Sequence, residues 1–332
     1  RKHVCGVCHV ENFEAIQPDG RGLNYRTDCC VLEQGTMSSS AGLAETEHEY
    51  TRIKVTPLAG ALGAEISGVD LANLDDASFE EIHRAWLDYH VIYVRRQEMT
   101  PEDHLAFARR WGDIHIHPFN APMDGYPEIL QLLKTEDSRR NNGNLWHSDQ
   151  MYTAQPAKAT ILIAREMPPF GGDTMFTNQY LAYETLSDGM KEMVGKLKGV
   201  NDGNSRKNFR GKTRAELAKS GQATTPQKEP DPDVQTVSVH PLVRTHPETG
   251  RKALYIGSHT VRIDGMTDDE SQPILQTLME HSTRPEFICR VRWEVGTLTM
   301  WDNRCCQHYA LNDYQGERRC VHKITVKGDT PF

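Results

Sequence analysis

Two short polar motifs, far apart in the chain, constrain its fold more than any other feature. His147 and Asp149 stand at i and i+2, so on a strand both side chains point to the same face. Alone, such a pair is common on protein surfaces. His308 adds a second imidazole near the C-terminus, and Arg319 adds a cation beyond it. Because two histidines and one carboxylate form the facial triad of non-haem Fe(II) enzymes, we expect a fold that brings the two motifs together.

The composition is that of a globular protein. Of the 332 residues, 25% are charged and 37% are hydrophobic, and the formal net charge is −8. Since no basic stripe accompanies this negative charge, we expect no nucleic-acid partner. No apolar run approaches the length of a membrane span, and no apolar signal region stands at the start of the chain. We therefore expect a cytoplasmic protein with no membrane partner.

The first 48 residues differ in character from those that follow. They show no helical or strand periodicity, and they end in small and acidic residues. We expect residues 1–48 to be a poorly ordered N-terminal extension, within which Met37 is a sensible translation start that would leave residues 1–36 outside the native protein.

The eight cysteines form one group in this extension and another near the C-terminus. Cys5, Cys8 and His9 match the c-type haem attachment pattern, and a zinc site shared with Cys29 and Cys30 is an alternative. A haem domain needs far more chain around the motif, so we favour neither. In a long chain with no export signal, we expect reduced thiols, including those in strand-like segments at Cys289, Cys305, Cys306 and Cys320.

From Tyr50 onward, short strands alternate with a few helices. Apolar residues at helical spacing predict a helix over residues 76–89, and Thr100-Pro101-Glu102-Asp103 opens another with an N-cap and Pro at N1. Further helices are expected over 178–197 and 268–281. Strands are expected at 53–55, 64–66, 91–94, 159–164, 172–176, 237–239, 253–256, 287–291, 297–301 and 321–326. This pattern predicts a mostly β domain over residues 49–332, with a jelly-roll (double-stranded β-helix, cupin-like) core and surrounding helices.

Residues 201–235 interrupt this regular pattern. They are polar, rich in Gly, Pro, Lys and Asp, and have no apolar period. A structureless stretch of this length inside a compact domain is more often a lid or a binding loop than filler. We therefore predict a lid-like insertion near 201–235.

Four motifs, in this order, resemble those of the Fe(II)/2-oxoglutarate-dependent dioxygenases of the taurine dioxygenase and aryloxyalkanoate dioxygenase (TauD/TfdA) family. The resemblance covers roughly residues 50–332. The motifs are Trp146-His147-Ser148-Asp149, Gly171-Gly172-Asp173-Thr174, the run from Trp301 to Ala310, and Arg318-Arg319. The resemblance implies an oxidoreductase that decarboxylates 2-oxoglutarate to succinate while it uses O2 to hydroxylate a small organic substrate.

The same resemblance implies a role for individual residues. His147, Asp149 and His308 would hold Fe(II), which leaves positions open for a bidentate 2-oxo acid and O2. Arg319 would bind the distal carboxylate of 2-oxoglutarate, with the hydroxyl of Thr174 as a second donor. A guanidinium suits this role because its planar fork matches a carboxylate and keeps its charge when buried.

The expected substrate residues depart from those of the taurine enzymes. His117 keeps a histidine that holds the sulfonate in those enzymes, but Lys323 stands where they have an arginine. Asn120 replaces a usual tyrosine, and His259 replaces an aromatic pocket residue. Because a lysine is a point charge that cannot reproduce a forked contact, we predict a small anionic substrate other than taurine, bound by Lys323 and His117.

Three other functions compete with this prediction. An aryloxyalkanoate dioxygenase would keep the fold and the iron but cleave its substrate at the ether carbon, and the segment 240–252 fits several branches of the family. A jelly-roll binding protein without turnover leaves the joint presence of three ligands and Arg319 unexplained. A zinc hydrolase can use the same triad, but it leaves Arg319 and Thr174 without a role. The family allows a homodimer or a higher homo-oligomer, and no sequence feature selects one.

Overall fold

The computed structural model describes residues 48–138, 141, 143–205, 211–212, 216 and 234–332. The predicted N-terminal extension lies outside these residues except for His48, and so do the four cysteines of its first thirty positions. Most of the predicted lid over 201–235 lies outside them as well.

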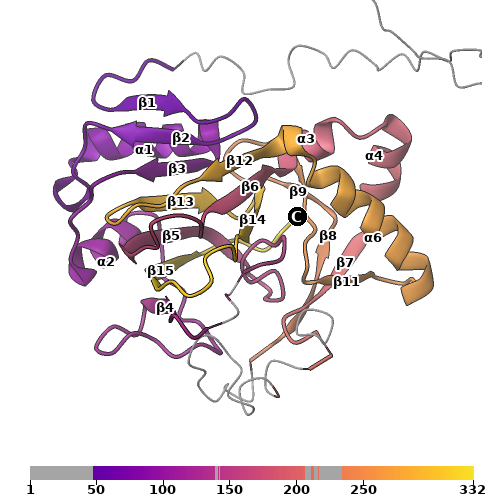
Figure 1. The fold of residues 1–332 in the computed structure, drawn as a ribbon. Helices are drawn as coiled ribbons and strands as arrows, with labels where there is room; N and C mark the ends of the chain where they lie inside the picture. Colours follow the sequence, from indigo (N-terminus) through magenta and orange to yellow (C-terminus); the bar gives the residue numbers. More distant parts are fainter. Residues whose placement is uncertain (1–47, 139–140, 142, 206–210, 213–215, 217–233) are drawn as a thin grey trace, which may run out of the picture. The chain divides into compact units, whose positions relative to one another are not determined.

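The largest sheet has seven strands, and only one of its neighbouring pairs is parallel. Its strands are β1 (Lys54–Pro57), β2 (Ala64–Ser67), β3 (Val91–Val94), β13 (Leu298–Asp302), β5 (Ala157–Glu166), β15 (Arg319–Lys327) and β4 (Leu130–Lys134), in that order across the sheet (Figure 1). The parallel pair is β2 with β3. Every residue of β3 is buried because both faces of this part of the sheet are covered.

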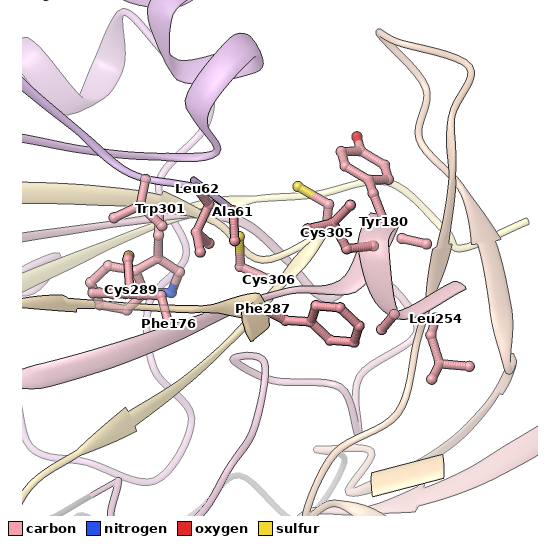
Figure 2. Close-up of a cluster of buried hydrophobic side chains, with 14 of the residues drawn as sticks. Ala61, Leu62, Phe176, Tyr180, Leu254, Phe287, Cys289, Trp301, Cys305 and Cys306 are labelled. Carbon is pink, nitrogen blue, oxygen red and sulfur yellow. The ribbon is translucent and has the colours of Figure 1, made fainter. Parts of the chain in front are cut away.

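A second sheet packs against one face of the first. It consists of β12 (Ile288–Val291), β6 (Thr174–Asn178) and β14 (Cys306–Ala310), with β6 in the middle. Phe176 of β6 and Trp301 of β13 meet between the two sheets, with their ring centroids 5.3 Å apart (Figure 2). Cys289 of β12 belongs to the same buried cluster.

The chain passes back and forth between these two sheets. It runs from β5 to β6, and later from β12 through β13 and β14 to β15. This alternation is the winding of a double-stranded β-helix, so the predicted jelly-roll core is confirmed. Two smaller sheets are also present. Strands β11 (Thr260–Ile263), β7 (Lys198–Asp202) and β8 (Val237–Pro241) form one, and β10 (Lys252–Leu254) and β9 (Val243–Thr245) form the other.

Two helices cover the opposite face of the seven-stranded sheet. Helix α1 (Asp76–Tyr89) begins where Asp75 caps the backbone N–H of Ser78, and α2 (Pro101–Arg109) begins with a capping box between Thr100 and Asp103. Both starts agree with the prediction. The apolar face of α1 joins a buried cluster with alternate residues of β2, β3, β5 and β13. These helices and the second sheet together bury the large sheet on both faces.

The single helix predicted over residues 178–197 is wrong. The structure has two helices there, α3 (Gln179–Glu184) and α4 (Asp188–Val194). Ser187 accepts a hydrogen bond from the backbone N–H of Met190 and so starts a new helix, although the apolar spacing continues across the break. Helix α6 (Asp268–Ser282) lies where it was expected, and two short 3-10 turns, η1 (Leu71–Asn73) and η2 (Pro285–Phe287), are also present.

The strand predictions were incomplete. Each strand range given above overlaps a strand of the structure, but the strand expected at His147 and Asp149 is absent, and no range was predicted for β4, β7, β9, β11 or β14. Because β7 runs to Asp202, the first two residues of the predicted lid belong to a strand. Within the described residues, Cys289, Cys305, Cys306 and Cys320 are buried free thiols, as expected. No helix in this part of the chain is long and apolar enough to cross a membrane.

Candidate active site

Three side chains meet where the two sequence motifs come together. One ligand atom from each of His147, Asp149 and His308 lies within 4.8 Å of the others. A bridge of two backbone hydrogen bonds holds the histidines: His147 N–H donates to His308 O at 3.2 Å, and His308 N–H donates to His147 O at 2.8 Å. The fold therefore brings together the three residues that the motifs indicated.

The expected strand at His147 and Asp149 is not formed. His147 makes only an isolated bridge to His308 of β14, and Asp149 begins a turn. The backbone N–H of Asp149 has a side chain as its hydrogen-bond acceptor in place of a neighbouring strand: it donates to Oδ1 of Asn303 at 3.0 Å. Both functional side chains still reach the same site.

The two carboxylate oxygens of Asp149 have different neighbours. Oδ2 accepts hydrogen bonds from Thr160 Oγ1 at 2.6 Å and from Lys323 Nζ at 2.7 Å. Oδ1 lies 3.8 Å from Nε2 of His147. Burial alone would raise the pKa of this carboxyl, but its surroundings, first of all the charge of Lys323, outweigh burial and hold the pKa well below its usual range. Asp149 is therefore an anion with one oxygen directed toward the histidines.

Both imidazoles are prepared to act as neutral ligands. Burial is the main cause that lowers the pKa of His147, and it lowers that of His308 further. Nδ1 of His147 donates to the carbonyl oxygen of Leu145 at 2.6 Å, which leaves the lone pair on Nε2, the nitrogen that faces Asp149. Nδ1 of His308 is buried and has no hydrogen-bond partner within the described residues. Two neutral imidazoles and one carboxylate fit a divalent iron ion.

Arg319 and Thr174 both lie beside a tryptophan, Trp293, that the sequence did not indicate. The guanidinium carbon of Arg319 is 5.6 Å from the centroid of the Trp293 ring, and Trp293 Nε1 donates to Thr174 Oγ1 at 3.0 Å. Arg319 is 9% exposed, and its Nε has no hydrogen-bond partner in the described part of the chain. The neighbouring Arg318 pairs instead with Glu166 at the surface.

Gly172 packs closely beside this arginine, in a backbone conformation that favours glycine. A Cβ on Gly172 would lie 3.3 Å from Cδ of Arg319 and from the ring of Tyr314, and the φ of Gly172 is +71°. Arg319 and Lys323 stand four residues apart on β15, so both point to the same face of the sheet. Since Lys323 reaches Asp149, the guanidinium of Arg319 lies on the side of the sheet that carries the triad.

Two of the predicted substrate residues, His117 and His259, belong to one row of aromatic rings, in which two other rings separate them. Successive ring centroids are 5.2 to 6.0 Å apart along the row His147, His259, Tyr152, Phe119 and His117. Nδ1 of His117 accepts hydrogen bonds from the backbone N–H groups of Phe119 and Asn120, so the proton of the neutral ring lies on Nε2. Asn120 is buried. Phe119 and Tyr152 were not singled out from the sequence, because a lone aromatic residue there predicts only core packing.

A second group of potential ligands, His246, Asp302 and Cys305, is also buried. In this group the guanidinium of Arg304 already supplies the positive charge that faces the carboxylate. Arg304 donates to Oδ1 of Asp302 at 2.9 Å and to Oδ2 at 2.7 Å, and His246 lies 3.0 Å from Oδ2. We therefore assign this group to a buried ion-pair network that fixes the turn after β13.

Comparison with known proteins agrees with this site. The model of the family described as taurine catabolism dioxygenase TauD, TfdA family matches residues 54–325. An alpha-ketoglutarate-dependent sulfate ester dioxygenase of Pseudomonas putida is 35% identical over 300 residues, which cover 88% of this chain and 95% of that protein. An (S)-phenoxypropionate/alpha-ketoglutarate-dioxygenase of Sphingobium herbicidovorans is 31% identical over 293 residues, 83% of this chain and 95% of that protein.

The fold comparison leads to the same family. The crystal structure of a taurine dioxygenase from Burkholderia xenovorans superposes with a TM-score of 0.70 at 35% identity, and the match covers 85% of this chain and 93% of that one. The alternatives of a binding protein without turnover and of a zinc hydrolase find no support among these relatives. The chain therefore belongs to the TauD/TfdA family, and it is a dioxygenase that depends on Fe(II) and uses 2-oxoglutarate and O2 as co-substrates.

Proposed function

We propose that this dioxygenase hydroxylates a small organic anion at an iron ion held by His147, Asp149 and His308. The observation that carries the proposal is the convergence of these three ligand atoms beside the ammonium group of Lys323. Fe(II), when bound there, supplies the open positions and the reducing electrons for the reaction of O2 with 2-oxoglutarate. We assign the activity to residues 49–332 as one domain, which the family match over 54–325 supports.

Arg319 and Thr174 form the proposed site for the distal carboxylate of 2-oxoglutarate. A buried guanidinium with an Nε that lacks a partner in the described residues is supporting evidence, because such a group stabilises an anion that completes its hydrogen bonds. The indole of Trp293 covers the guanidinium and keeps water away from one side of it. Trp293 also donates to the hydroxyl oxygen of Thr174, which leaves the hydroxyl proton to be donated elsewhere.

The substrate anion is proposed to lie between Lys323 and His117, with Asn120 and His259 beside it. An ammonium group has three protons, so Lys323 can hold Asp149 with one and still donate to a substrate oxygen. His117 offers its Nε2 proton. The relative from Pseudomonas putida is named for sulfate esters, whose charged group is of the kind that this pair of donors binds.

We propose three substrate classes: sulfate esters, sulfonates and carboxylates. Of these, a sulfate ester gives the most easily detected product. Insertion of one oxygen atom of O2 into the C–H bond next to the ester oxygen gives a carbon that bears both a hydroxyl and the sulfate. The C–O bond to sulfate then breaks as the hydroxyl loses its proton. An aldehyde or ketone and inorganic sulfate leave the site, while 2-oxoglutarate loses CO2 and takes up the other oxygen atom to become succinate.

A second candidate is the cleavage of aryloxyalkanoates. The aromatic rings of Phe119 and Tyr152, between His117 and His259, favour it because they provide an apolar surface for an aryl group. The relative named for (S)-phenoxypropionate gives further support. Hydroxylation next to the ether oxygen would release a phenol by the same collapse.

The test is a product assay with the protein loaded with Fe(II) and 2-oxoglutarate under anaerobic conditions. After oxygen is admitted, succinate is measured with alkyl sulfates, alkanesulfonates, short carboxylates and phenoxyalkanoates in turn, and sulfate, sulfite and phenol are measured beside it. We expect substrate-dependent succinate with at least one of the first three classes. Phenol as the only product would favour the second candidate, and equal background succinate in all assays would contradict the proposed substrate class. His308→Ala is the control without turnover.

A further inference from the structure

Asn303 and Thr160 hold Asp149 from two sides. Asn303 lies in the turn between β13 and β14, and Thr160 lies on β5; both side chains are fully buried. Oδ1 of Asn303 accepts from the backbone N–H of Asp149 at 3.0 Å, and Nδ2 donates to Thr160 Oγ1 at 3.0 Å. Thr160 Oγ1 in turn donates to Asp149 Oδ2 at 2.6 Å. The three residues form a closed ring of hydrogen bonds.

Chemistry alone fixes the direction of every bond in this ring. The backbone N–H of Asp149 and the indole N–H of Trp301, which lies 3.1 Å from Oδ1 of Asn303, can only donate. The amide oxygen of Asn303 must therefore face them, and its NH₂ group must face Thr160. Because Thr160 accepts this bond and has a single hydroxyl proton, that proton goes to Asp149 Oδ2.

We infer that Asn303 and Thr160 are positioning residues that present Asp149 to the metal through Oδ1 alone. The inference rests on the proposed role of Asp149 as a metal ligand. Thr160 fixes Oδ2 together with Lys323, while Asn303 fixes the backbone of the same residue, so the carboxylate cannot turn about its side-chain bonds without breaking a buried hydrogen bond. Oδ1 then remains directed to the side of His147. Hydrogen bonds of this kind tune metal affinity by orienting the ligand.

The main test is Thr160→Val, which replaces the hydroxyl by a methyl group of similar size. Co(II) is the probe, added to metal-free protein without 2-oxoglutarate, and binding is followed by its visible d–d absorption. We expect the affinity for Co(II) to fall by about 10- to 100-fold and the band shape to change as the carboxylate loosens. Thr160→Ser keeps the hydroxyl and should bind within about 3-fold of the wild type.

Thr299→Val is the matched control. Thr299 lies on β13, opposite Leu162 of β5, and is as fully buried as Thr160. Its hydroxyl has no hydrogen-bond partner among the described residues. The same Thr-to-Val change there should leave the Co(II) affinity and the band unchanged. If Thr160→Val does not fold, Thr160→Ala compared with Thr160→Ser answers the same question.

Wild-type Co(II) affinity in Thr160→Val, or an equal loss in Thr299→Val, would overturn the inference while leaving the metal site in place. Failure of the proposed function gives a different result: the wild-type protein and His308→Ala would then bind Co(II) equally weakly. The two failures are therefore distinguishable in one experiment, and neither readout depends on turnover.

Discussion

The ammonium group of Lys323 lies 2.7 Å from Oδ2 of Asp149, although the two residues are separated by more than half of the chain. The side chain of Lys323 is 14% exposed, so water screens this pair only weakly. The lysine expected to hold the substrate thus also holds a proposed metal ligand. With the substrate bound as proposed, one side chain would contact both the substrate anion and this carboxylate.

Lys323→Met tests the substrate part of this coupling. We expect the KM for the anionic substrate to rise by about 10-fold or more, because a hydrogen bond to a charged group is worth roughly 1.5–3 kcal/mol. The KM for 2-oxoglutarate should stay within a small factor, since that co-substrate is assigned to Arg319. Steady-state succinate formation with each compound varied in turn measures both. An unchanged substrate KM would remove Lys323 from the substrate site.

Gly172→Ala tests the proposed 2-oxoglutarate site through the packing of Arg319. The new methyl group would lie 3.3 Å from Cδ of Arg319, so the guanidinium must shift, and we expect the KM for 2-oxoglutarate to rise on the order of 10-fold. Gly265→Ala is the matched control, because its φ of +79° carries similar backbone strain but no atom lies within 4 Å of the added Cβ. Equal effects of the two changes would mean that strain, and not Arg319, is responsible.

The sequence predicted those features that depend on local signals. The predicted starts of α1 and α2 were correct because each helix begins at a local cap, Asp75 or Thr100, which lies next to the residues that it caps. Ser187 is also a local cap, but apolar spacing on both sides of it suggested one continuous helix. Strand β14 was missed because its buried residues include Gln307 and therefore do not alternate between apolar and polar.

The candidate site also has some features that motifs in the sequence predict and others that depend on contacts between distant segments. The triad was predicted from motif spacing, and the fold brings its three members together. The contact of Lys323 with Asp149 and the position of Trp293 over Arg319 depend on how β15 lies against the rest of the structure. No pattern along the chain encodes such contacts between distant segments, so the sequence alone could not reveal them.

Chelation should destabilise the protein as well as inactivate it. A metal that binds only the folded state adds about 2.7 kcal/mol to the free energy of unfolding when its concentration is 100 times the dissociation constant. For a domain of this size, EDTA should therefore lower the Tm by about 5 °C or more, and Fe(II) or Co(II) should restore it. Thermal denaturation monitored by circular dichroism measures this shift. His308→Ala should show no dependence on metal, and a similar response in that variant would speak against the triad as the binding site.

The burial of His104 leads us to predict how the free energy of unfolding depends on pH. This residue of α2 is fully buried, and neither ring nitrogen makes a hydrogen bond of good geometry within the described residues. Burial, followed by the charge of Arg165, lowers its pKa to about 3, although a weaker backbone interaction with Ile161 raises it. Above pH 6.5 the ring is neutral in both the folded and the unfolded state. As the pH falls from 6.5 toward 3, the unfolded state takes up a proton that the folded state does not, so stability is lost.

At pH 5 this single group lowers the free energy of unfolding by about 2 kcal/mol relative to pH 7 and above. In His104→Leu we expect that part of the decline to disappear, and the stability at neutral pH to be equal or higher, since no buried ring nitrogen is left without a partner. Urea denaturation of both proteins at pH 7.5, 6 and 5 measures the difference. All curves are fitted with one shared value for the slope of the free energy of unfolding against urea concentration. Parallel curves for the two proteins would show that His104 already carries a proton in the folded state or has an acceptor beside it.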